Sequence, residues 1–273
     1  MTIVFTPAFN ALVKEAQFTK EMLGSGATQI RGANYATKGI YFQAFTSLST
    51  GLERIGKLCL MLDYYIETQG QFPDDKYMKN VIGHKISLIY QKSMSIINDR
   101  SISLNYLGNL DGTIHQNILT VLSDFAGGDR YSNINLLVRS KRQSDPIASW
   151  FETVDRAIFQ LCVSAKKKAT IAHNAHIVNQ MIGGFSSVLY SSESGSEITD
   201  VEDASYRTGM WKAVAPYRQL FVLQIIRFWV ELVWGLQDKA MAIGNDIPFL
   251  SEIFAPFYND DSYLRSRKTW DKI

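Results

Sequence analysis

The chain has 273 residues, of which 46% are hydrophobic and 20% charged, a composition typical of a globular protein with a sizeable core. Its formal net charge of +2 is too close to zero to indicate nucleic acid as a partner from composition alone. The first residues lack a cationic leader followed by an apolar run, so no signal peptide is predicted. Cys59 and Cys162 lie in apolar helical patterns typical of reduced thiols, which favours a cytoplasmic location.

The first predicted helix runs from Pro7 to about Leu23, with Thr6 as its N-cap. Gly24 and Gly26 are expected to end it. Apolar residues spaced by three and four then predict a long helix over residues 38–68. The stretch 69–75 contains glycine and proline and is predicted to be a loop.

Apolar spacing predicts another helix around residues 86–97, with Gly83 and His84 near its beginning. A further helix is expected over residues 113–125, ending at a Gly-Gly pair, and residues 139–146 form a polar connection. The pattern over residues 147–182 fits one long helix or a broken one. A last long helix is predicted from Ser205 to about Ile243, and Pro216 is a candidate kink.

These elements predict an all-α fold in three parts. Residues 1–185 are expected to form a helical bundle, and the serine-rich and acidic segment 186–204 a mobile loop. Residues 205–273 are expected to pack on the bundle as C-terminal helices, in a single compact unit. The most apolar stretch, Leu220 to Leu236, is interrupted by Gln224, Arg227 and Glu231, so we interpret it as a buried helix and expect no membrane partner.

Three segments resemble the HEPN superfamily, in particular abortive-infection proteins with a HEPN-type four-helix domain. They are GLERIGKLCL at residues 51–60, VIGHKISLIY at residues 81–90 and LSDFAGGDRYSNINLL at residues 122–137. The resemblance covers about the first half of the chain. It implies a HEPN-like bundle elaborated with additional C-terminal helices, a homodimer, and RNA or a nucleotide as the ligand.

The family includes metal-independent ribonucleases of toxin–antitoxin and antiphage defence systems, and also members that bind nucleotides or partners without cleavage. In the nucleases an arginine precedes a histidine by four to six residues. No histidine of this chain has an arginine at that separation. Lysine-based approximations exist, namely Lys79 before His84 and Lys166 to Lys168 before His173. Lysine offers a point charge where arginine offers a planar fork, so the enzyme assignment stays open.

The resemblance and local chemistry together select a candidate site. As catalytic residues we select His84 as acid or base, with Arg54 or Lys79 stabilising charge on a phosphate. Glu53 and Lys57 are spaced i,i+4 on the long helix, where they either pair structurally or line a cleft with His84. A histidine next to a helix start could also help to hold an anion.

Arg130, Tyr131 and Asn133 follow the Gly-Gly break and are candidate ligand-binding residues, with a structural clamp as the alternative. Two groups of basic residues, 139–142 and 166–168, form either a patch for nucleic-acid phosphates or a solvated face. His173 and His176 share a helix face but have no acidic or cysteine neighbour within a turn, so no metal is expected.

No P-loop, dinucleotide fingerprint, Cys-x-x-Cys pair or Gly-x-Ser-x-Gly elbow occurs in the sequence, and we expect no cofactor. Two hypotheses remain. The first is a HEPN-like protein that binds or cleaves RNA or a nucleotide in a bacterial defence or toxin-like setting. The second is a non-catalytic helical interaction or regulatory module, whose polar motifs only fix the packing of helices.

Overall fold

The structure is a computed structural model that describes residues 5–142 and 144–272. In chain order its elements are α1 (Pro7–Gly32), η1 (Tyr35–Thr37), α2 (Gly39–Glu67), α3 (Asp75–Tyr77), η2 (Met78–Ile82), α4 (Ile86–Asp99), α5 (Thr113–Ala126), η3 (Asp129–Tyr131), α6 (Ser132–Leu137), α7 (Pro146–Trp150), η4 (Phe151–Asp155), α8 (Arg156–Cys162), α9 (Ala165–Ile182), β1 (Tyr190–Ser191), β2 (Glu197–Ile198), α10 (Val201–Met241), α11 (Leu250–Phe254), η5 (Ala255–Phe257) and α12 (Asp261–Ser266). The expected all-α class is confirmed.

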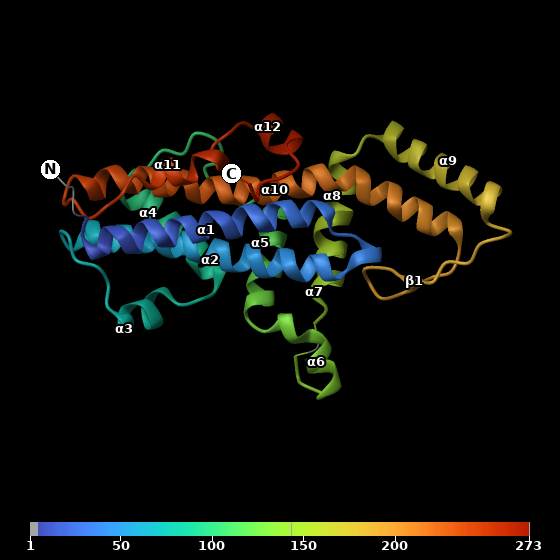
Figure 1. The fold of residues 1–273 in the computed structure, drawn as a ribbon, viewed down its shortest axis with the longest axis horizontal. Helices are drawn as coiled ribbons and strands as arrows, with labels where there is room; N and C mark the ends of the chain where they lie inside the picture. Colours follow the sequence, from blue (N-terminus) through green and yellow to red (C-terminus); the bar gives the residue numbers. More distant parts are fainter. Residues whose placement is uncertain (1–4, 143, 273) are drawn as a thin grey trace.

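Three long helices form the centre of the molecule. α1 packs along α2, and α10 packs against both of them (Figure 1). α10 has 41 residues, which corresponds to a rod about 60 Å long at the rise of an α-helix. α4 and α5 pack on α2, and α9 lies along α10. The buried apolar side chains of these helices form a core cluster that joins the first and the last parts of the chain.

α1 starts where the sequence predicts but continues well beyond the expected end. Thr6 is the N-cap, and its side chain accepts a hydrogen bond from the backbone N–H of Phe9 at 3.1 Å. The helix then passes through Gly24 and Gly26 to Gly32. A Cβ atom on Gly26 would lie only 2.6 Å from Cγ of Leu48 on α2. The glycine therefore permits close packing of α1 on α2, and the predicted helix end at Leu23 is wrong.

The other predicted helices agree with the structure within a few residues. α2, α4 and α5 lie where the apolar spacing places them, and the loop after α2 ends at Asp74, the N-cap of α3. The pattern over residues 147–182 is broken: α8 ends at Cys162, and α9 begins at Ala165. Ser164 caps α9 by accepting a hydrogen bond from the backbone N–H of Lys167.

The predicted loop segment 186–204 contains the two short strands and the first turn of α10. β1 and β2 pair antiparallel, with Tyr190 opposite Ile198. Asp200 caps α10 through its side chain, which accepts a hydrogen bond from the N–H of Asp203. This hairpin lies at the end of the molecule where α9 and the beginning of α10 meet (Figure 1).

α10 is long and apolar enough to cross a membrane by length and composition alone. However, 83% of its most apolar window is buried inside the protein, as in the core helix of a soluble protein. Arg218 and Arg227 are buried along this helix, at 1% exposure each. Arg218 donates two hydrogen bonds to the carboxylate of Asp155 and two to the carbonyl oxygens of Ile30 and Ala33. Internal polar contacts therefore satisfy a charge in the middle of the core.

Candidate functional site

The structure brings three of the predicted site residues into direct contact. Glu53 and Lys57 lie one turn apart on α2, and the Lys57 Nζ is 2.7 Å from the Glu53 Oε1. The Nδ1 atom of His84 is 2.8 Å from the same carboxylate oxygen and 3.1 Å from the Lys57 Nζ. Glu53 and Lys57 are largely buried, whereas 73% of the His84 side chain is exposed. We call these three residues the His84 cluster.

The cluster can hold the imidazole in either neutral tautomer. With a proton on Nδ1, the ring donates to Glu53; without it, Nδ1 accepts a hydrogen bond from Lys57. Among the described residues, Nε2 has no hydrogen-bond partner. An imidazole that is oriented through one nitrogen and open at the other has the arrangement that proton transfer to a ligand requires.

The backbone around His84 explains why its side chain reaches α2. The π-helix η2 ends at Ile82, and its C-cap Gly83 has a φ of 72° and donates a hydrogen bond from its N–H to the carbonyl oxygen of Met78. This positive φ is easily adopted by glycine, and it separates η2 from α4, which begins at Ile86. The N-cap of α4, Lys85, makes no side-chain hydrogen bond. The first N–H groups of α4 therefore lack a side-chain cap two residues from His84.

Arg54 lies next to Glu53 in sequence but points to a different neighbour. Its Nη1 is 2.9 Å from both carboxylate oxygens of Glu15 on α1. Consecutive residues on a helix project in different directions, so Arg54 faces α1 while Glu53 and Lys57 face His84. The arginine is thus tied to α1 and makes no hydrogen bond to His84 among the described contacts.

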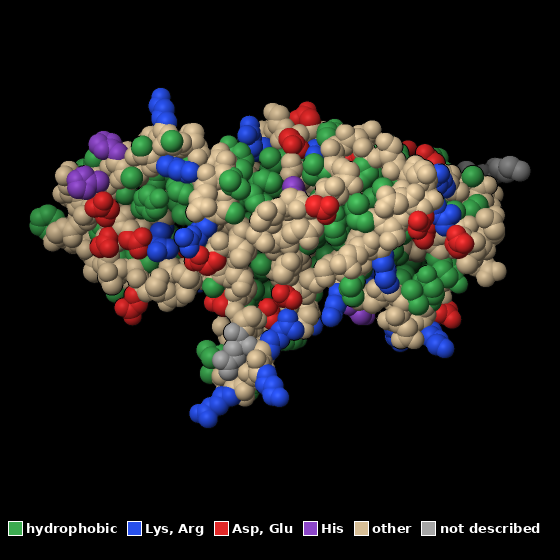
Figure 2. Space-filling model, turned by 180° about the vertical axis from the view of Figure 1, so that it is seen from behind, with side chains coloured by type: hydrophobic (Ala, Val, Ile, Leu, Met, Phe, Trp, Pro, Cys, Tyr) green, Lys and Arg blue, Asp and Glu red, His purple; other side chains and the backbone are tan. Residues whose placement is uncertain are grey.

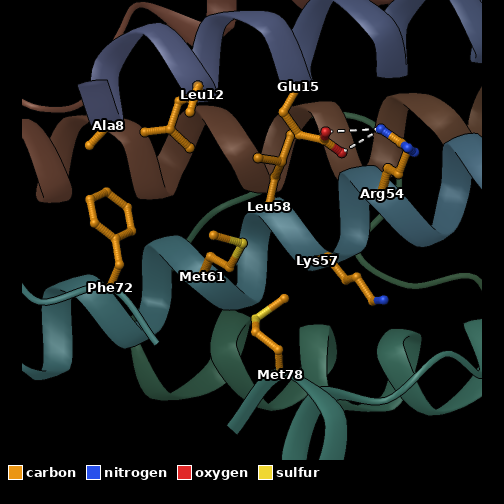
Figure 3. Close-up of a pocket in the computed structure, with 10 residues that line it drawn as sticks. Ala8, Leu12, Glu15, Arg54, Lys57, Leu58, Met61, Phe72 and Met78 are labelled. Atoms are coloured by element: carbon orange, nitrogen blue, oxygen red, sulfur yellow. Dashed lines mark hydrogen bonds and ion pairs between the residues drawn. The ribbon is translucent and has the colours of Figure 1, made fainter. Parts of the chain in front are cut away.

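A cavity of about 410 Å³ lies between α1, α2 and the segment that includes Phe72 and η2. Its floor is apolar, with Phe72, Met61 and Met78 converging from three segments, and the Arg54–Glu15 pair closes one end (Figure 3). Lys57 belongs both to the cavity wall and to the His84 cluster. The complete lining is Ala8, Ala11, Leu12, Glu15, Arg54, Lys57, Leu58, Met61, Phe72 and Met78.

The remaining predicted site residues lie elsewhere. Lys79 forms an exposed ion pair with Asp75 at 2.6 Å, on the outer side of the α3–η2 segment. Arg130 stacks over the ring of its neighbour Tyr131, with its Cζ 5.1 Å from the ring centre. With Asn133, these residues belong to η3 and α6, on a projection separate from α3 (Figure 1). Arg130, which was selected as a ligand-binding residue, therefore does not join Arg54 and His84 in one site.

Several residues of the cavity could not be selected from sequence. Glu15 and Met61 lie within ordinary amphipathic patterns, and only the packing of α1 on α2 shows that they face the same space. Phe72 lies in the loop after α2, where an isolated aromatic residue gives no indication of its direction. The i,i+4 spacing of Glu53 and Lys57 was the one signal that sequence analysis could use.

The two histidines of α9 do not form part of this site. The Nδ1 atom of His176 lies 3.4 Å from a carboxylate oxygen of Glu202 on α10, and its Nε2 contacts Gln180. Among residues 5–142 and 144–272, no group of three histidine, cysteine or acidic side chains is arranged to hold a metal ion.

Comparisons with protein-family models, with curated proteins and with solved structures find no match to this chain.

Proposed function

We propose that this chain is a HEPN-like protein that binds RNA or a nucleotide at the His84 cluster and the adjoining cavity, in a bacterial defence or toxin-like setting. The observation that carries the proposal is the contact of His84 Nδ1 with both Glu53 and Lys57, at 2.8 Å and 3.1 Å, at the edge of an apolar cavity. The three sequence segments that resemble HEPN proteins include all three residues of the cluster.

The cavity and the cluster have complementary chemistry for a nucleotide. An apolar floor with Phe72 and two methionines suits the face of a base, because sulfur and aromatic groups pack well against π-systems. Lys57 supplies a cation at the rim, and the uncapped start of α4 supplies N–H groups for a phosphate. Base and phosphate would then be held on opposite sides of Lys57.

If the bound RNA is cleaved, the cluster suits a metal-independent reaction. His84, through Nε2, would take the proton from a ribose 2′-hydroxyl, whose oxygen attacks the adjacent phosphorus. The bond from phosphorus to the 5′-oxygen of the next nucleotide then breaks, and that oxygen takes up a proton from water. Lys57 would stabilise the negative charge that develops on the phosphate. The geometry favours Lys57 for this role, because its Nζ contacts the His84 ring at 3.1 Å, whereas Lys79 and Arg54 pair with Asp75 and Glu15 and make no contact with His84 among the described hydrogen bonds.

The test measures binding and cleavage separately, in the presence of a chelator. Fluorescence anisotropy with single-stranded RNA of mixed sequence and with adenosine monophosphate reports binding, and gel electrophoresis reports cleavage. We expect Lys57→Met to weaken binding by about tenfold or more, because it removes a charged hydrogen-bond donor. His84→Ala should abolish cleavage, whereas His173→Ala, which alters an exposed histidine on α9, should change neither quantity.

A second function is favoured by two specific observations. Arg54 is neutralised by Glu15, and the arginine–histidine spacing of the nucleases is absent. A non-catalytic interaction or regulatory module would need neither a free arginine nor cleavage. If RNA and mononucleotide fail to bind the wild-type protein at all, the nucleotide-binding proposal is wrong and this alternative is preferred.

A further inference from the structure

Residues 129–142 form a projection whose base is held by one side chain. The guanidinium of Arg142 forms an ion pair with the buried carboxylate of Asp129. Its two terminal nitrogens donate to the carbonyl oxygens of Gly127 and Asp124, at 2.9 Å and 2.8 Å. Arg142 therefore joins the two ends of the projection, and the residues between, which include α6, extend away from the helical bundle (Figure 1).

The end of this projection is unusually apolar for an exposed segment. Ile134, Leu136, Leu137 and Val138 are 56%, 63%, 82% and 67% exposed. Scattered apolar residues are normal on a protein surface, but four aliphatic side chains within five positions form a contiguous patch. Among residues 5–142 and 144–272, none of the four belongs to the core cluster or to the residues packed against it.

The charges around this patch are all of one sign. Residues 130–142 contain four lysines and arginines and no aspartate or glutamate. Arg142 is used in the ion pair at the base, whereas Arg130, Arg139 and Lys141 form no ion pair within the described parts of the chain. Figure 2 shows lysine and arginine side chains together with hydrophobic ones on the projection.

We propose that residues 130–141 form a tip that docks this protein on an anionic membrane surface. Leu136, Leu137 and Val138 would enter the boundary between headgroups and acyl chains, while Arg130, Arg139 and Lys141 contact lipid phosphates. The sequence-based expectation of no membrane partner considered only spanning segments, and a peripheral tip requires none. The proposal does not depend on the RNA-binding function of the His84 cluster.

The chemistry of the tip favours a bilayer over other anionic or apolar partners. Single-stranded RNA is held mainly by aromatic stacking, whereas the exposed apolar groups here are mostly aliphatic. A symmetric contact between two tips would place like charges opposite each other, which opposes self-association. An anionic lipid surface complements both the aliphatic groups and the surrounding cations.

The test is co-sedimentation of the full chain with vesicles of phosphatidylcholine, with and without phosphatidylserine, at low and high salt. The wild-type protein should bind the phosphatidylserine vesicles, and salt should weaken this binding. Leu136→Asp combined with Leu137→Asp should reduce the binding by about tenfold or more. Arg139→Glu combined with Lys141→Glu should also reduce it by about tenfold or more and remove the preference for phosphatidylserine.

Matched controls alter exposed residues on or next to α9, away from the projection (Figure 1). Phe185→Asp changes a side chain that is 95% exposed, and Lys166→Glu combined with Lys167→Glu reverses two exposed charges on α9. Both should leave vesicle binding unchanged, and circular dichroism should show native helix content in every variant. Failure of the wild-type protein to bind, or equal losses in the controls, overturns the proposal. So does a tip variant that changes only RNA binding or only the sedimentation coefficient of the protein alone.

Discussion

His84 and Glu53 lie 31 positions apart in the chain, and yet the imidazole Nδ1 is 2.8 Å from the Glu53 Oε1. The contact joins the bend before α4 to the middle of α2, at a place where His84 is 73% exposed. Together with the Lys57 Nζ, which lies 3.1 Å from the same nitrogen, this contact orients the imidazole ring. Solvent screening nevertheless limits how much this contact adds to the free energy of unfolding.

A double-mutant cycle measures this coupling directly. We expect Glu53→Gln and His84→Asn, singly and together, to give a coupling energy below about 1 kcal/mol in chemical denaturation, falling as salt is added. A cycle between Glu53→Gln and His176→Asn, two residues without a contact, should give additive effects. A large coupling that persists at high salt would show that the pair is more deeply buried than its exposure indicates.

Breaking the ion pair of Asp155 with Arg218 should cost far more stability than breaking a surface pair. Both side chains are 2% exposed, and burial raises the pKa of Asp155 although Arg218 opposes this effect. Arg218→Met leaves a buried carboxylate without its partner, so the free energy of unfolding should fall by about 3–5 kcal/mol. Arg54→Met breaks the half-exposed pair with Glu15 and should cost less than about 1 kcal/mol. Equal losses in urea denaturation of the two variants would contradict this assignment.

Gly26 should be intolerant of even one added methyl group. The new Cβ would lie 2.6 Å from the Leu48 Cγ and 3.0 Å from the Leu48 backbone nitrogen, so α1 must move away from α2. Gly26→Ala should therefore destabilise the protein by about 1–3 kcal/mol.

The matched control is Gly32→Ala on the same helix, where no atom lies within 4 Å of the added Cβ. It should be neutral or stabilising by up to about 1 kcal/mol. Thermal or urea unfolding of both variants provides the comparison.

His115 should make stability depend on pH. Its ring is buried beside α10, where its Nε2 lies 2.9 Å from the Gln224 Oε1, and desolvation by burial lowers its pKa. Below about pH 6.5 the unfolded chain takes up a proton at this histidine that the folded protein resists. Stability is therefore lost as the pH falls below that value, until the folded protein is protonated as well.

Replacement of this histidine should remove its share of the pH dependence. In His115→Gln, the free energy of unfolding should decrease less between about pH 7 and pH 5 than in the wild-type protein, by up to about 1.4 kcal/mol per pH unit. His173→Gln is the control, because that histidine is exposed on α9 and should leave the profile unchanged. Parallel profiles for wild-type protein and His115→Gln would contradict the prediction.

The helices were largely predictable because their signals are local. Apolar spacing located α2, α4 and α5 within a few residues, since this pattern is set within one or two turns. The end of α1 was not predictable. In the sequence, Gly24 and Gly26 are typical of a helix C-terminus. In the structure they lie inside α1 and leave room for close contact with Trp270 and Leu48, which only tertiary packing brings near.

The candidate site was predictable in part for the same reason. The spacing of Glu53 and Lys57 placed them on one helix face, and their association with His84 was one of two interpretations of that face. Sequence could not show that Arg54 turns to Glu15, because that contact depends on how α1 lies on α2. Nor could it show that Arg130 leaves the bundle, because the direction of the projection is set by the Arg142 contacts at its base.

The position of α10 also determines when this protein can fold during its synthesis. α1 and α2 emerge first from the ribosome, but the helix that covers both of them is not complete until residue 241 has been added. Until then the surfaces of α1 and α2 that contact α10 are not fully covered, and before residue 218 is added the guanidinium that satisfies the carbonyl oxygens of Ile30 and Ala33 is absent. The nascent chain therefore remains a potential chaperone client for most of its translation.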